Sequence, residues 1–146
     1  MGQLTFPIVG SELVVGVRVN RNAAALSAVQ ASGLPAPASI ATLAEIDTGS
    51  NVTAVSAAIL TALGIPPEAH NNQTTGIGGQ FAVRLFRVSL SIVHPADPQA
   101  TWFTHPDLLV MELPAGFPVD VLIGMDVLLG CRMLVNGPAR RLTIDF

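Results

Sequence analysis

The sequence has few charged residues, a single cysteine and no long apolar run. Only 12% of its 146 residues are charged, whereas 50% are hydrophobic, and the net charge is −3. No apolar run approaches the roughly 18 residues of a membrane span, so the hydrophobic excess predicts a buried core or an oligomer interface. The acidic balance, with no basic cluster beyond Arg140 and Arg141, argues against nucleic acid as a partner.

The single cysteine and the N-terminal residues bear on the cellular compartment of the protein. The lone Cys131 excludes an internal disulfide and gives no sign of an oxidising compartment. The N-terminus lacks the basic start and long apolar run of a signal peptide, so we expect a cytoplasmic protein. The length predicts one domain over residues 1–146. The three histidines lack metal-ligand spacing, so no metal or cofactor is expected.

The most informative stretch is an apolar segment, residues 43–46, that ends in Asp47-Thr48-Gly49-Ser50. A strand there would deliver the Asp47 carboxylate as a general acid or base. Gly49 permits a tight turn and a close approach of its N–H to a carboxylate, and the two hydroxyls can donate hydrogen bonds. The tripeptide alone also fits a simple Asx-type turn after a strand.

Two further stretches strengthen the catalytic interpretation. Residues 75–84 form a glycine-rich tip that runs into an alternating strand, and residues 119–129 form an apolar strand that ends in Gly124 before a short helical pattern. A phosphate-binding loop is disfavoured at the first stretch, because no Lys-Ser/Thr pair follows the glycines and a strand comes next instead of a helix.

In this order and spacing, the three stretches resemble the retropepsins, the retroviral aspartic proteases with their cellular and bacterial relatives. The resemblance covers residues 13–146. It implies an all-β closed barrel with a flap hairpin and one short helix near the C-terminus. It also implies an aspartic endopeptidase that cleaves peptide or protein substrates.

Aspartic proteolysis needs two carboxylates on one water, and this chain has one Asp-Thr-Gly. Asp120, Asp126 and Asp145 are not followed by Ser/Thr-Gly. A two-fold homodimer would supply the pair, since an isologous interface places the same residue on both sides of the axis. The resemblance implies this dimer, with residues 142–146 interleaved at its interface. The alternative is a catalytically silent module of the same fold that binds or scaffolds.

The resemblance also assigns site residues. Asp47, Thr48 and Gly49 are the expected catalytic residues, with Thr48 tying the two active-site loops together across the dimer. The expected substrate-binding residues are Ser50, Asn51, Gly76, Ile77, Gly78, Gly79 and Leu122.

Individual roles follow for some of these residues. The N–H of Ile77 would reach the substrate carbonyl through a water, and Leu122 would wall the substrate pocket. Ser50 could donate to the outer oxygen of Asp47. Asn51 and Met125 replace an acid and an arginine that pair with each other in retroviral members.

Glu45 is unusual for its position. Side chains alternate along a strand, so Glu45 and Asp47 share one face. The acid could line a pocket that accepts a polar or basic side chain, or form a structural ion pair with Arg84 or Arg87. We expect the ion pair.

The remaining pattern predicts many short strands with little helix. Strands are expected at residues 11–19, 38–46, 108–111, 119–123, 132–135 and 141–145, and hairpin arms at residues 69–75 and 80–93. Helical patterns cover residues 23–29, 52–63 and 125–129. Residues 94–106, with three prolines, are expected to form a loop.

Overall fold

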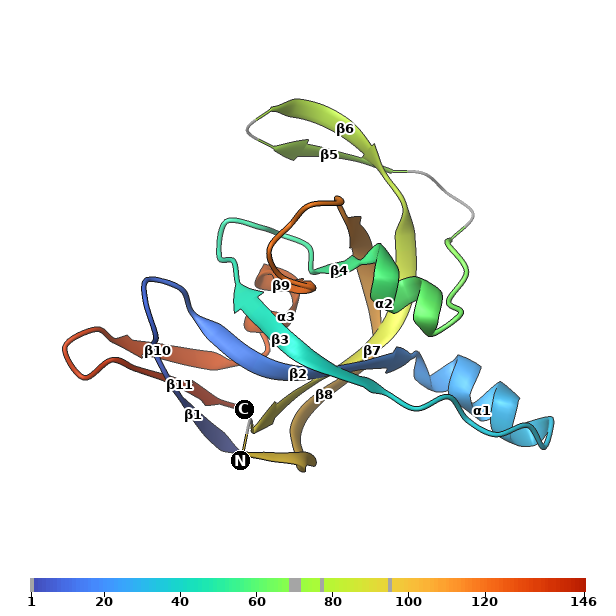
Figure 1. Ribbon diagram of the computed structural model, residues 1–146, viewed down its shortest axis with the longest axis horizontal. Helices are drawn as coiled ribbons and strands as arrows, with labels where there is room; N and C mark the ends of the chain where they lie inside the picture. The colour runs from blue at the N-terminus through green and yellow to red at the C-terminus, as the bar shows by residue number, and fades with distance from the viewer. Residues whose placement is uncertain (1, 69–71, 77, 95) are drawn as a thin grey trace.

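The computed structural model describes residues 2–68, 72–76, 78–94 and 96–146. Six strands close into a barrel (Figure 1). In barrel order they are β2 (Val14–Arg21), β3 (Ile40–Ile46), β9 (Val121–Ile123), β4 (Ala54–Ser56), β8 (Asp97–Leu113) and β7 (Leu85–His94). The hairpin of β5 (Asn72–Gly76) and β6 (Gly79–Val83) extends above the barrel. This confirms the predicted all-β closed barrel.

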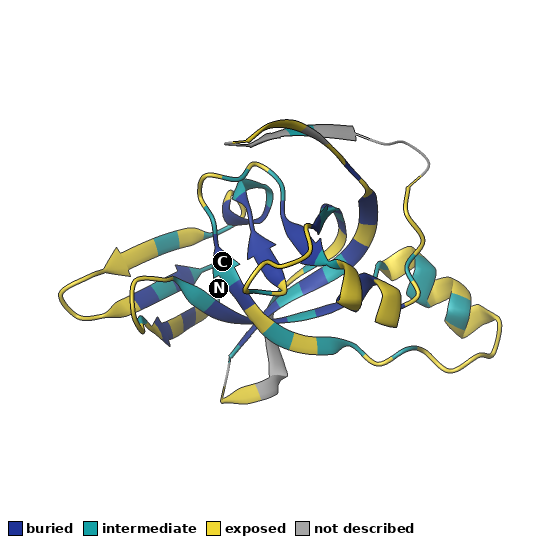
Figure 2. Ribbon diagram, turned by 45° about the horizontal axis from the view of Figure 1, so that its top comes forward, coloured by how far each residue is buried: buried dark blue, intermediate teal, exposed yellow. Residues whose placement is uncertain are grey.

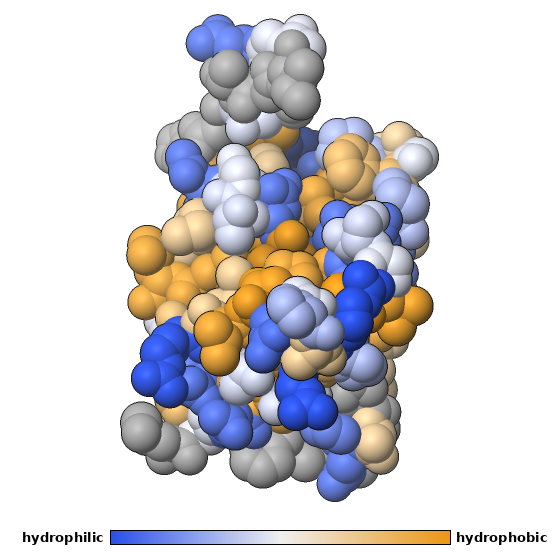
Figure 3. Space-filling view, turned by 90° about the vertical axis from the view of Figure 1, so that its left-hand side faces the viewer, coloured by the Kyte–Doolittle hydropathy of each residue, from blue (hydrophilic) through white to orange (hydrophobic). Residues whose placement is uncertain are grey.

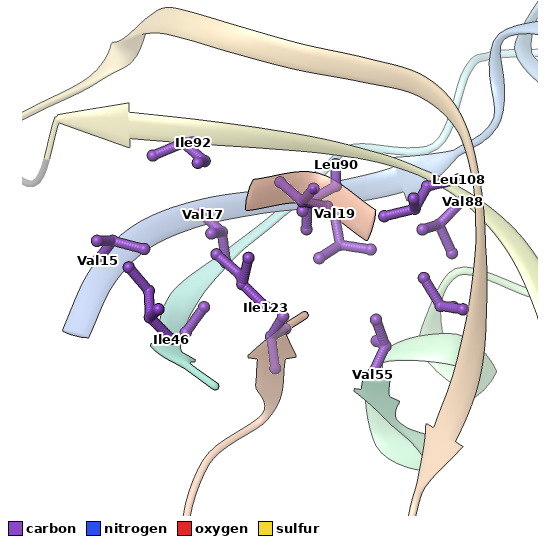
Figure 4. Close-up of a cluster of buried hydrophobic side chains, with 14 of the residues drawn as sticks. Val15, Val17, Val19, Ile46, Val55, Val88, Leu90, Ile92, Leu108 and Ile123 are labelled. Atoms are coloured by element: carbon purple, nitrogen blue, oxygen red, sulfur yellow. The ribbon is translucent and has the colours of Figure 1, made fainter. Parts of the chain in front are cut away.

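The core fills the inside of this barrel. In β2, the alternating residues Val15, Val17 and Val19 are at most 1% exposed, and they meet Ile46 and Ile123 from β3 and β9 (Figure 4). Alternation sends every second side chain inward, so the neighbouring residues of these strands face outward. Since Ile46 faces inward, the next residue, Asp47, is expected to face outward.

The helices are short and lie outside the barrel. They are α1 (Ala23–Ala31), α2 (Ala57–Ala62) and α3 (Met125–Leu128). Asn22 caps α1 by accepting a hydrogen bond from the Ala25 N–H at 3.0 Å, as Asn does at many helix N-termini. The predicted short helix near the C-terminus is confirmed as α3. In the described part of the chain, no helix is long and apolar enough to cross a membrane.

Two predicted elements are wrong. The helical pattern over residues 52–63 divides into β4 and α2, because residues 54–56 pair with β8 and residues 54–55 also pair with β9. The loop expected over residues 94–106 is instead a β7–β8 hairpin, in which Ile92 pairs with Phe103. The register between β7 and β8 shifts between the pairs Val88–Leu108 and Leu90–His105, and Pro106 lies in this irregular stretch of β8. A bulge tolerates proline, which cannot donate a backbone hydrogen bond.

A three-stranded sheet lies beside the barrel, in the order β1 (Gln3–Pro7), β11 (Arg141–Asp145), β10 (Arg132–Asn136). β1 was not predicted. Since β11 pairs with β1 on one edge and β10 on the other, it has no free edge for a second copy. The expected interleaving of residues 142–146 with a partner's strands is therefore wrong for this arrangement.

β10 differs from β11 in having an unpaired edge. Its residues are mostly exposed (Figure 2), and the exposed fractions of Leu134 and Val135 are 61% and 46%. Exposed edge strands are ready templates for pairing with another chain, and β10 lacks a covering element among the described residues.

Candidate active site

The loop between β3 and β4 carries the predicted acid. The parallel pairing of β3 with β9 continues one residue beyond Ile46, where the Asp47 N–H donates to the Ile123 carbonyl at 2.9 Å. The half-buried Asp47 follows the buried Ile46, so its side chain turns to the outer face of the barrel. The β5–β6 hairpin extends over that face (Figures 1 and 2).

The carboxylate of Asp47 is held by its own loop. The Gly49 N–H donates to Asp47 Oδ1 at 2.9 Å, which is the contact predicted from the sequence. The Ser50 N–H closes the turn on the Asp47 carbonyl at 3.2 Å. A Cβ atom at position 49 would lie 3.2 Å from the same carboxylate oxygen, so glycine leaves room for this bond.

Ser50 does not have its predicted partner. Its hydroxyl donates to the Val52 carbonyl at 2.7 Å. The predicted hydrogen bond from Ser50 to Asp47 is therefore wrong, and Ser50 instead stabilises the turn.

A buried polar cluster fastens this loop to α3. Thr53, which is 0% exposed, donates its N–H to Asp126 Oδ2 at 2.9 Å and its hydroxyl to Asp126 Oδ1 at 2.7 Å. The Thr53 hydroxyl also accepts from the Gly124 N–H at 3.0 Å. This role of Asp126 was not predicted from the sequence, where it was considered only as a second catalytic acid. The sequence does show an acid in the first turn of a helix that follows a glycine. A negative charge at that position interacts favourably with the helix dipole.

Gly124 lets the loop and α3 approach closely. A Cβ atom there would lie 2.7 Å from the Val52 carbonyl carbon and 3.0 Å from the Ser50 carbonyl oxygen. The next residue, Met125, donates its N–H to that Ser50 carbonyl at 2.8 Å. The backbone around the acid is thus fixed from two directions, by β9 and by α3.

Two other residues of the loop between β3 and β4 have exposed side chains. Thr48 and Asn51 are exposed, and neither side chain has a hydrogen-bond partner within the described ranges. Met125 packs against the core. The two departures from the retroviral pattern thus remove both members of a polar pair, with Asn51 left in solvent and Met125 turned inward.

Leu122 contributes to an apolar row on the outer face. The register aligns Glu45 of β3 with Leu122 of β9, Leu122 with Ala54 of β4, and Ala54 with Met111 of β8. Leu122, Ala54 and Leu113 form a small cluster separate from the barrel core. In Figure 1, β9 and β4, two of the strands that carry this row, lie below the β5–β6 hairpin.

Glu45 does not form the expected ion pair. Arg84 pairs with Glu112, and Arg87 pairs with Asp107 at 3.1 Å and with Glu68 at 3.7 Å. Arg87 belongs to β7, on the opposite side of β2 from β3, and Arg84 precedes β7 and pairs with Glu112 of β8, so neither strand is a neighbour of β3. The carboxylate is half-buried and has no hydrogen-bond or ion-pair partner among the residues that the structure describes.

The glycine-tipped segment is a hairpin, as predicted, with Gly76 paired to Gly79. Gly79 has a φ of +105°, whereas Gly78 does not require a positive φ. Ile77, the predicted water-mediated donor, lies outside the described residues, as do residues 69–71 of the first arm. Arg84 clamps the base of the hairpin to β8, because its Nε donates to Glu112 Oε2 at 2.9 Å.

The described residues include no cluster of three or more His, Cys, Asp or Glu that could hold a metal ion. The chemistry that the loop itself offers is acid–base chemistry at one carboxylate, which is fixed by one backbone N–H.

Comparisons with known proteins agree with this arrangement. A family model described as aspartyl protease matches residues 38–127, a range that includes β3, the acid loop, the hairpin and β9. Among solved structures, a retropepsin-like aspartic protease from Rickettsia conorii is similar with a TM-score of 0.64 and 11% sequence identity, over 99% of this chain and 91% of that chain. At that identity the similarity shows the fold alone. A search of curated proteins gave no match.

Proposed function

This chain belongs to the aspartyl protease family, and we propose that it is an endopeptidase in which Asp47 activates the water that attacks a peptide bond. One observation carries this proposal: the Asp47 carboxylate ends β3 on the outer face, held by the Gly49 N–H at 2.9 Å. A fixed carboxylate costs little reorganisation when it takes a proton from water. The intact Asp-Thr-Gly also favours an enzyme over a silent binding module.

The reaction requires a second carboxylate. One ionised carboxylate takes the proton from water, while a protonated one activates the scissile carbonyl, so that two acids share one proton. We propose that the second acid is Asp47 of another copy, related by a two-fold axis. Thr48, which is exposed beside Asp47, would then hydrogen-bond to the partner's loop.

We further propose that the two copies meet at β10. The β3–β4 loop, the β5–β6 hairpin and the end of the β10–β11 hairpin all extend to the same side of the molecule, the left in Figure 1. Figure 3 looks at this side and shows hydrophobic residues across its middle. Antiparallel pairing of two β10 edges would cover Leu134 and Val135, continue the sheet into the second copy and satisfy a two-fold axis.

Substrate would lie between the barrel face and the hairpin. Leu122, which is 8% exposed, would contact its side chains, and Asn51 would contact its backbone. The glycines of the hairpin, Gly76, Gly78 and Gly79, would let the tip close over it, with Ile77 as a backbone donor. No cofactor enters this mechanism.

Cleavage of a diverse peptide library, with and without a statine-type inhibitor, tests the proposal. Asp47→Asn should lower kcat/KM by about 10² to 10⁴ or more, whereas Asp120→Asn, which removes an equal charge outside the acid loop, should retain most activity. An Asp47→Asn protein that cleaves like wild type would refute the assignment. Binding of library peptides by the wild-type protein without cleavage of any of them would favour the silent module.

Mixing wild-type and Asp47→Asn chains tests whether two copies share one active site. If each active pair needs one Asp47 from each copy, excess Asp47→Asn chain should suppress wild-type activity as mixed dimers form. Specific activity should also fall on dilution below the dimer dissociation constant. Activity that is independent of concentration and unaffected by added variant would show that one copy suffices.

A further inference from the structure

Glu45 is the polar end of the apolar row described above. In the register it lies beside Leu122 on one side and Val14 on the other. Asp47 follows two residues later, directly after the end of β3, and its N–H continues the pairing with β9, so by strand alternation both side chains project from the same face. A substrate positioned for attack at Asp47 would therefore pass Glu45 with a side chain close to the scissile bond.

Among the residues that the structure describes, no cation forms an ion pair with Glu45. The sequence contains no lysine and seven arginines. Four of these are engaged elsewhere in the structure: Arg84 with Glu112, Arg87 with Asp107 and Glu68, Arg132 with Asp145, and Arg140 with the Gly10 carbonyl.

The three remaining arginines do not reach Glu45 either. Arg21 donates to the Leu63 carbonyl at 2.8 Å. Arg18 lies opposite Ala41, four residues along β3 from Glu45, and Arg141 belongs to β11 in the other sheet. Glu45 is thus a half-buried residue whose carboxylate has no positive partner within the described ranges.

We infer that Glu45 is a specificity-determining residue that binds an arginine or lysine side chain of the substrate next to the scissile bond. The inference rests on the proposed function, because it takes Asp47 as the reacting centre. Burying a carboxylate beside leucine and valine is unfavourable unless a charge or hydrogen-bond donor joins it. A basic substrate side chain would supply both, and its aliphatic stem would lie along Leu122.

A pair of otherwise identical peptides tests this inference, one with arginine and one with glutamine at the position that the library identifies beside the cleaved bond. Wild type should have a kcat/KM about tenfold to a hundredfold higher for the arginine peptide, the range expected for a hydrogen bond to a charged group. Glu45→Gln should bring the ratio of the two kcat/KM values close to one. Glu68→Gln, which removes the same charge beside Arg87, should leave the ratio unchanged.

Binding to the Asp47→Asn protein separates this inference from the proposed function. With chemistry removed, the arginine peptide should still bind more tightly than the glutamine peptide, and adding Glu45→Gln should abolish the difference. Arginine-selective binding without wild-type cleavage would support the role of Glu45 and refute the protease proposal. Cleavage without arginine preference, or a preference that survives Glu45→Gln, would overturn the role of Glu45.

Discussion

Asp126 accepts two hydrogen bonds from Thr53, one at each carboxylate oxygen, with distances of 2.9 Å to the N–H and 2.7 Å to the hydroxyl. Asp126 Oδ1 also accepts from the Val127 N–H at 3.0 Å. One side chain therefore joins the strand after the acid loop to the first turn of α3. Because Thr53 is fully buried, loss of the carboxylate would leave its two donors without their acceptor.

The first prediction is that Asp126→Ala destabilises the protein by about 1 to 3 kcal/mol, since it leaves the buried Thr53 donors without an acceptor. Asp126→Asn, which keeps one carbonyl oxygen, should lose less. Urea unfolding of the three proteins measures the difference. Equal stability of Asp126→Ala and wild type would mean that this cluster does not hold the loop.

Local patterns were sufficient to predict the acid loop. The apolar lead-in, the acid and the glycine lie within seven residues, and the hydrogen bond from Gly49 to Asp47 follows from that short-range geometry. The hairpin was predictable for the same reason, as its glycine tip and alternating arm are adjacent in the sequence.

Contacts between distant segments were not predictable in the same way. Thr53 and Asp126 are 73 residues apart, and nothing local in either stretch shows that they meet. The ion pair expected for Glu45 failed because it required knowing which strand lies beside β3. β1 could have been found, since Leu4 and Phe6 alternate with Gln3 and Thr5, but its partner β11 is at the other end of the chain.

The second prediction concerns the hairpin. Gly79→Ala should alter the hairpin, because L-residues are strained at a φ of +105°. Gly78→Ala is the matched control, since a Cβ atom at either position meets nothing within 4 Å. We expect Gly79→Ala to lower kcat/KM several-fold more than Gly78→Ala, with the melting temperature of both near wild type. A large loss of thermal stability would show that the hairpin is structural.

The third prediction concerns the edge of β10. Leu134→Glu should raise the dimer dissociation constant at least about tenfold, because two carboxylates would be brought together at the proposed two-fold contact. Leu34→Glu provides the control, as the exposed fractions of Leu134 and Leu34 are 61% and 64%. Sedimentation velocity measures both. If Leu34→Glu dissociates the dimer and Leu134→Glu does not, the copies meet elsewhere.

The fourth prediction concerns acid stability, and it depends on Asp145 at the centre of the three-stranded sheet. The register places Gln3, Asp145 and Arg132 in one row across β1, β11 and β10. Asp145 accepts from Gln3 Nε2 at 2.7 Å and from Arg132 Nε at 2.8 Å. The hydrogen bond from Gln3, followed by that from Arg132, lowers the pKa of Asp145 below its ordinary value of 3.8.

The lowered pKa of Asp145 means that the folded state favours the charged carboxylate. Its stabilisation is therefore fully present above the unfolded pKa, near 4, and is lost as the pH falls through the lower folded pKa. Asp145→Asn keeps the shape and one acceptor but no charge, so it should be less stable than wild type at pH 7 and approach wild type below about pH 3. The pKa of Asp107, lowered by hydrogen bonds from Asn22 and Arg87, contributes equally to both proteins and cancels in the comparison. Urea unfolding of both proteins from pH 7 to pH 2.5 measures the difference. A difference that stays constant with pH would mean that the charge of Asp145 does not stabilise the sheet.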